Sequence, residues 1–110
     1  MLIEAGAGES IELFKEILGL FEEESKIKLA AIRETADSAD FDALSRAAHA
    51  LAGSSANIGG REVWLKAREI ENLCKAGNGD QAVARVSDLE DTYQKTMIQL
   101  RHFVSQVDGK

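Results

Sequence analysis

Hydrophobic residues recur every three or four positions along most of the chain, which is the spacing of amphipathic α-helices. Four such stretches are separated by short polar or glycine-containing breaks, among them the pair Gly59 and Gly60. Glycine commonly ends a helix because it tolerates the left-handed backbone conformation. The predicted helices span residues 9–36, 41–57, 61–76 and 81–106.

Long helices joined by short turns pack as antiparallel neighbours. The pattern therefore predicts an all-α protein, an antiparallel up-down four-helix bundle formed by one domain over residues 1–110. Gly6, Ala7 and Gly8 precede the first apolar position and indicate a flexible N-terminal lead-in.

The first predicted helix carries two apolar stripes. Phe14 and Leu18 belong to one stripe, and Leu13 and Ile17 belong to a second stripe beside it. One stripe is enough to pack a helix on a core. The second stripe is therefore either a wider buried face or an exposed docking surface, and the sequence leaves both open.

Composition narrows the class of protein. Among 110 residues there is no proline, and the apolar fraction of 45% is enough for a buried core. The net charge of −6 argues against nucleic acid, whose phosphates attract basic surfaces. No apolar stretch is long enough to span a membrane or has the form of a signal peptide. With Cys74 as the single cysteine, we expect a cytoplasmic protein without an internal disulfide.

His49 is the candidate chemical group. In a helix it lies about 100° from Ala48 and about 140° from Leu44, both on the buried stripe, so it is expected at the exposed edge. Gly53 follows one turn later on the same face. A glycine inside a helix costs about 1 kcal/mol relative to alanine, and the close approach of another surface would explain it.

The stretch His49-x-Leu51-x-Gly53-Ser54-Ser55-x-x-x-Gly59 resembles the signature of histidine phosphotransfer domains. The resemblance implies that His49 accepts a phosphoryl group from a receiver-domain aspartate and passes it to another receiver. It also implies that Glu71 orients the imidazole and that Gly53 lets the receiver approach.

The chain departs from that signature at one position. The family usually has lysine three residues after the histidine, and this chain has Ala52. Arg46 and Lys75 are the candidates to supply the missing positive charge to the phosphoryl group. The resemblance also suggests residues that contact the receiver, with an apolar patch beside the histidine: Leu13, Ile17, Ala50, Ala52 and Ala56.

The partners implied are response-regulator receiver domains or a hybrid sensor kinase, with Mg²⁺ supplied by the receiver. We expect a monomer that binds no cofactor or metal of its own, because the sequence has no ATP loop and no metal-ligand spacing. The protein would then be a phosphoryl carrier and not an enzyme. The alternative is a helical-bundle binding module, an adaptor that uses the same face independently of phosphate.

Overall fold

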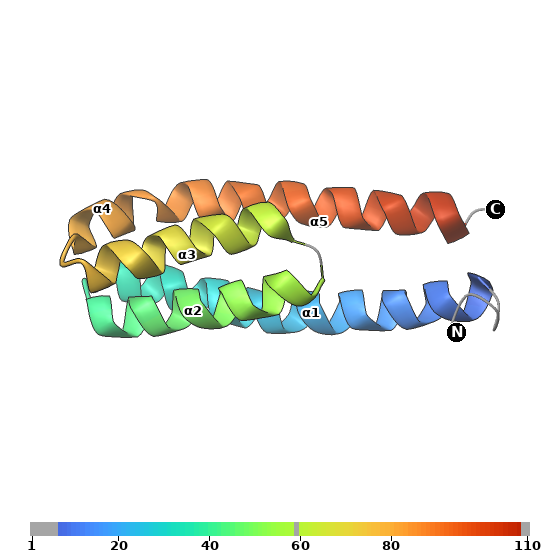
Figure 1. Ribbon diagram of the computed structural model, residues 1–110, viewed down its shortest axis with the longest axis horizontal. Coiled ribbons are helices and arrows are strands. Elements are labelled where there is room, and N and C mark those ends of the chain that lie inside the picture. Colours follow the sequence, from blue (N-terminus) through green and yellow to red (C-terminus); the bar gives the residue numbers. More distant parts are fainter. Residues whose placement is uncertain (1–6, 59, 109–110) are drawn as a thin grey trace.

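Helices make up nearly all of the computed structural model, which describes residues 7–58 and 60–108, with side chains from 11 to 58 and from 60 to 107. The four long helices alternate in direction along the chain and lie side by side (Figure 1). The predicted all-α helical bundle is confirmed. The helices are α1 (Ala7–Asp37), α2 (Phe41–Asn57), α3 (Arg61–Lys75), α4 (Gly79–Ala84) and α5 (Val86–Asp108).

The predicted lead-in is wrong for two of its three residues. Ala7 and Gly8 belong to the first turn of α1, while Gly6 lies outside the described residues. A single glycine disfavours a helix by only about 1 kcal/mol. A glycine near the N-terminus therefore does not determine the residue at which a long helix begins.

The fourth predicted helix is also two segments instead of one. At Arg85 the backbone N–H bonds to the carbonyl of Ala82, three residues back, and the chain makes one tight turn between α4 and α5. Hydrophobic spacing is insensitive to a single such turn, because Val86 and Leu89 still face the core on its far side. The periodicity alone could not locate this break.

The core lies between the four long helices, and each contributes residues at helical spacing. In α2, Leu44 and Ala48 are buried as predicted, and so are Leu51 and Ser55, while Phe41 is half-buried. Tyr93 in α5 is the largest fully buried side chain, and its hydroxyl lies 2.6 Å from Ser25 Oγ in α1. Other core residues include Leu18, Phe21, Ile32, Leu44, Ala48, Leu51, Val63, Ala67, Ile70, Leu89 and Met97.

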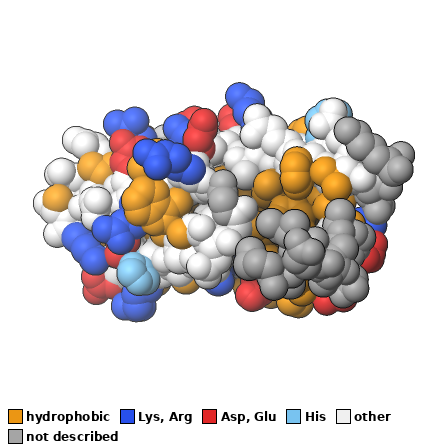
Figure 2. Space-filling model, turned by 45° about the vertical axis from the view of Figure 1, so that its right-hand side comes forward, with side chains coloured by type: hydrophobic (Ala, Val, Ile, Leu, Met, Phe, Trp, Pro, Cys, Tyr) orange, Lys and Arg blue, Asp and Glu red, His pale blue; other side chains and the backbone are white. Residues whose placement is uncertain are grey.

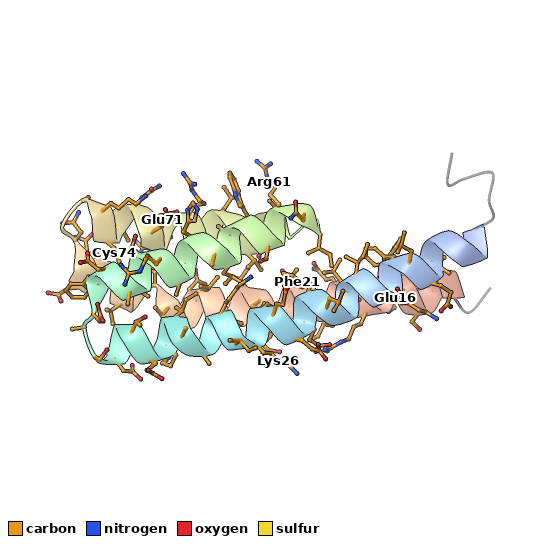
Figure 3. The ribbon with its side chains drawn as sticks, turned by 90° about the horizontal axis from the view of Figure 1, so that it is seen from below. Glu16, Phe21, Lys26, Arg61, Glu71 and Cys74 are labelled. Carbon is orange, nitrogen blue, oxygen red and sulfur yellow. The ribbon has the colours of Figure 1, made fainter. Side chains whose placement is uncertain are left out.

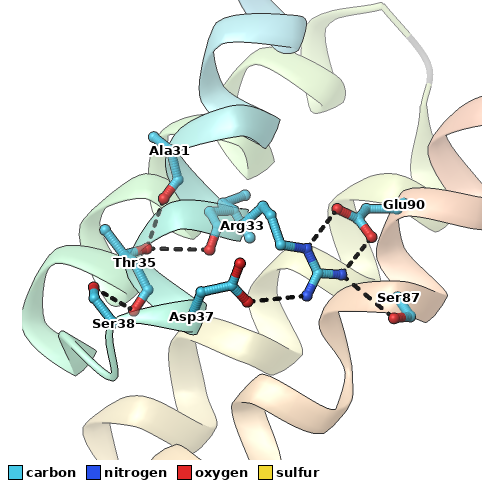
Figure 4. A network of polar contacts seen from close by, with 8 residues as sticks. Ala31, Arg33, Thr35, Asp37, Ser38, Ser87 and Glu90 are labelled. Atoms are coloured by element: carbon cyan, nitrogen blue, oxygen red, sulfur yellow. Dashed lines mark hydrogen bonds and ion pairs between the residues drawn. The ribbon is translucent and has the colours of Figure 1, made fainter.

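A polar network also joins α1 to α5 at the surface. Arg33 donates two hydrogen bonds to Glu90, at 3.1 and 2.5 Å, and reaches Asp37 and Ser87 at 3.4 Å (Figure 4). Arg33 and Glu90 are more than a third exposed, so solvent screens the pair and its contribution to stability is small. The network helps to fix the register between the two longest helices.

The start of α2, the helix that carries His49, is held by two local features. Asp40 caps the helix, because its carboxylate accepts a hydrogen bond from the backbone N–H of Ala43 at 3.2 Å. Gly79 at the start of α4 lies against the Phe41 ring, and a Cβ at position 79 would lie only 2.6 Å from ring atoms. This glycine is required by close packing.

We expect Gly79→Ala to destabilise the protein by about 1–3 kcal/mol, because the new methyl group must displace the Phe41 ring. Urea denaturation measures the difference. Gly19→Ala is the matched control, since Gly19 is exposed in α1 and a Cβ there meets nothing within 4 Å. That control should stabilise the protein by up to about 1 kcal/mol. Equal effects of the two substitutions would contradict the packing argument.

Candidate functional site

His49 lies in the middle of α2 with 67% of its side chain exposed. Its neighbours Ala48 and Leu51 face the core, so the helical phase turns the imidazole outward. The ring is held on one edge, because Nδ1 lies 2.9 Å from Oε2 of Glu71 in α3. The opposite ring nitrogen, Nε2, has no hydrogen-bond partner among the described residues.

Glu71 is almost completely buried, with 2% of its side chain exposed. It follows Ile70 on the inner side of α3, and Figure 3 shows it between the helices and not on the outer surface. Lys75, one turn later, donates a hydrogen bond to the same oxygen Oε2 at 2.8 Å. Oε1 has no hydrogen-bond partner in the described structure, and Arg68 Nε lies 3.7 Å from it.

The charge of Glu71 follows from these contacts. Burial raises the pKa of the carboxyl, but hydrogen bonds from Lys75 and His49 outweigh burial, so the net pKa lies below its ordinary value. Glu71 is therefore ionised at neutral pH. An ionised carboxylate can only accept hydrogen bonds. A neutral imidazole bonded to it must carry its proton on Nδ1, which leaves the Nε2 lone pair exposed.

Small residues surround His49 on the exposed face of α2. Ala50, Gly53 and Ala56 are all exposed. A Cβ built on Gly53 meets nothing within 4 Å, so no contact within the described chain requires glycine at this position. The surface beside the imidazole is low and uncharged at these three positions, and a partner surface has room to approach.

Ala52 does not belong to this surface, and its prediction as a receiver contact is wrong. Only 2% of Ala52 is exposed, although it lies only about 60° around the helix from His49. Since α2 and α3 are antiparallel and His49 faces Glu71, the helical register brings Ala52 and Arg68 to the same level. Arg68 is therefore a cation near the position where the family has lysine. The sequence analysis missed it, although its spacing of three residues before Glu71 could have indicated that both side chains share one face of α3.

Arg46 and Lys75 both line a shallow hollow with His49, Glu71 and Ser45. Lys75 is bound to Glu71, whereas Arg46 makes no ion pair or hydrogen bond through its side chain within the described residues. Of the two cations predicted from the sequence, Arg46 is therefore the one whose side chain has no bonded partner among the described residues.

Leu13 and Ile17 are exposed, at 45% and 44%, so the second stripe is not a wider buried face. They do not, however, lie beside His49. Lys28 Nζ in α1 donates to Ser54 Oγ in α2 at 2.6 Å, and this contact sets the register of the two helices. At 1.5 Å per residue, Leu13 is roughly 30 Å and Ile17 roughly 24 Å from the level of His49.

Figures 2 and 3 agree with this placement. Hydrophobic side chains gather at the end of the bundle where α1 and α5 extend past α2 and α3 (Figure 2). Glu16, which precedes Ile17, lies near that end and far from Glu71 (Figure 3). The predicted apolar patch next to the histidine is therefore wrong in position. Lys28, which the sequence analysis missed, donates a hydrogen bond from α1 to Ser54 of α2, and only the register of the helices reveals this contact.

Two other residues with reactive side chains lie elsewhere. His102 is exposed on α5. Burial, followed by the charge of Asp42, raises the pKa of the half-buried Cys74 thiol, which disfavours its nucleophilic form. Within residues 7–58 and 60–108, no group of three or more His, Cys, Asp or Glu side chains is arranged to hold a metal ion.

Comparison with known families agrees with the geometry of the site. The model of the Hpt domain family matches residues 16–109, nearly the whole chain. The chain belongs to this family, the histidine phosphotransfer domains, which carry phosphoryl groups in phosphorelays and are not kinases. Its partners are thus receiver domains or kinases of a phosphorelay. No curated protein and no solved structure matches the chain significantly. None of the described helices is long and apolar enough to cross a membrane.

The lowered pKa of Glu71 predicts how the stability of the folded protein depends on pH. A carboxyl whose pKa is lower in the folded state stabilises the fold above its unfolded pKa, and this contribution is lost as pH falls through the folded pKa. Between about pH 6 and about pH 3, the free energy of unfolding should therefore fall more for the wild type than for Glu71→Gln. Urea denaturation at the two pH values tests this. Glu62→Gln, at an exposed position of the same helix, should keep the wild-type slope, and parallel curves for all three proteins would contradict the assignment.

Proposed function

We propose that His49 accepts a phosphoryl group at Nε2 from a receiver-domain aspartyl phosphate and returns it to the aspartate of another receiver. The observation that supports this most directly is an imidazole that is 67% exposed and bonded through Nδ1 to a buried carboxylate. This arrangement presents the Nε2 lone pair to solvent and to a docking partner.

In the forward step, the Nε2 lone pair forms a bond to phosphorus as the phosphorus–oxygen bond of the aspartyl phosphate breaks. The aspartate leaves as a carboxylate with the bonding electrons. The proton on Nδ1 stays in place, so the phosphorylated ring becomes a cation. In the second step, a carboxylate oxygen of the acceptor receiver's aspartate bonds to phosphorus as the nitrogen–phosphorus bond breaks. The bonding electrons return to Nε2 and restore the neutral ring.

Glu71 is placed to stabilise that developing charge, because its Oε2 lies 2.9 Å from Nδ1. A fixed carboxylate aimed at a charge that forms during the reaction stabilises the transition state without further rearrangement. The phosphoryl oxygens require positive charge on their own side. We expect Mg²⁺ held by the receiver to supply most of it, and Arg46 of this chain to add to it from the rim.

The receiver is expected to dock on the low surface of α2 around Gly53, with Ala50 and Ala56 at its edges. We also expect the chain to work as a monomer in the cytoplasm. Its single cysteine, Cys74, leaves no internal disulfide and is compatible with a reducing compartment.

The direct test is to incubate the protein with a phosphorylated receiver and follow the label. The wild type should gain acid-labile, base-stable label, and His49→Gln should gain none. His102→Gln is the matched control and should be labelled like the wild type, because His102 lies on another helix. Label on His49→Gln would refute the assignment. A wild type that binds receivers without accepting label, with His49→Gln binding equally well, would favour the adaptor.

Gly53 supplies a second test, because stability and transfer should change in opposite directions. Gly53→Ala should stabilise the isolated protein by up to about 1 kcal/mol. Gly53→Gln adds a longer side chain on the docking face and should slow transfer from the receiver roughly tenfold or more, because small displacements of reacting groups have large effects on rate. Gly19→Ala should stabilise without changing transfer. Unchanged transfer in Gly53→Gln would exclude close docking at this position.

A further inference from the structure

The amine of Lys75 is bonded on the Nδ1 side of the imidazole, through Glu71. Its Nζ lies 2.8 Å from Oε2 of Glu71, the same oxygen that accepts the hydrogen bond from His49 Nδ1 at 2.9 Å. The Lys75 side chain is 65% exposed, but its amine is bonded to a carboxylate that is 2% exposed. Nε2, where the phosphoryl group would be carried, is on the opposite edge of the ring.

We infer that Lys75 is a positioning residue that acts on His49 through Glu71, and not a cation that binds the phosphoryl group. This inference rests on the proposed function of His49. A buried carboxylate with one hydrogen-bonded cation is held in one orientation and stays ionised. Without that cation, Glu71 is freer to rotate and to become protonated. A protonated carboxyl can donate to Nδ1 and select the ring form with its proton on Nε2, which has no lone pair there to attack phosphorus.

The other charged groups near Glu71 do not replace this contact. Arg68 approaches the other oxygen, Oε1, at 3.7 Å, which is too long for a hydrogen bond. Arg46 lines the same hollow but makes no ion pair with Glu71 in the described structure. Besides His49 itself, Lys75 is thus the only described side chain that hydrogen-bonds the carboxylate.

The first test needs no receiver. In the full chain labelled with ¹³C and ¹⁵N, Lys75→Gln should raise the pH at which the Glu71 carboxyl titrates. It should also increase the share of His49 rings protonated on Nε2, observed through the ring-nitrogen shifts while the ring is neutral. Lys75→Arg should restore both signals. Lys66→Gln, on the same helix, removes an ion pair with exposed Asp88 and should change neither. Unchanged Glu71 and His49 signals in Lys75→Gln would overturn the inference.

The second test is a double-mutant cycle on the rate of phosphoryl acceptance. Lys75→Gln should slow acceptance roughly fivefold, the effect of one lost hydrogen bond. In a Glu71→Gln background, where the amide oxygen can still accept from Nδ1, the same substitution should change the rate by less than about twofold. An equal loss in both backgrounds would mean that Lys75 acts on the phosphoryl group directly. If the wild type accepts no label while the spectroscopic signals still move, the proposed function fails and the coupling of Lys75 to the ring remains.

Discussion

The site depends on one buried carboxylate. Glu71 is almost fully enclosed between α2 and α3, yet it bonds an imidazole that is mostly exposed. Burial alone would favour the neutral carboxyl, and the hydrogen bonds from Lys75 and His49 reverse that preference. The bundle therefore provides a fixed negative charge at the base of a surface histidine. The ring orientation and the free Nε2 both follow from this contact.

Much of the fold could be predicted from periodicity, because each helix buries one stripe. The bounds of α2 agree with the prediction, since Asp40 caps one end and a glycine pair follows the other in the sequence. The break at Arg85 could not be predicted, because a single tight turn leaves the hydrophobic stripe intact. The start of α1 was missed because one glycine is too weak a signal to end a helix.

The features of the site that could be predicted are those of residues within one helix or one sequence motif. The exposure of His49 and the open surface at Gly53 follow from helical phase within α2. The placement of Leu13 and the contact of Lys28 depend on the axial register of α1 against α2. Hydrophobic patterns do not specify that register. Ala52 was misplaced because residues three positions apart differ by only about 60° around a helix. Helical phase alone therefore does not separate the exposed His49 from a position that is buried in the bundle.

Glu71 also has a thermodynamic consequence in the proposed reaction. A carboxylate beside Nδ1 interacts more strongly with the cationic, phosphorylated ring than with the neutral ring, so it shifts the equilibrium between phosphohistidine and aspartyl phosphate toward histidine. Lys75 shares the same oxygen and competes for its charge, which moderates that shift. The balance between these two contacts on Oε2 would set how evenly the phosphoryl group divides between the two proteins. A carrier that must both load and unload requires that division to stay close to even.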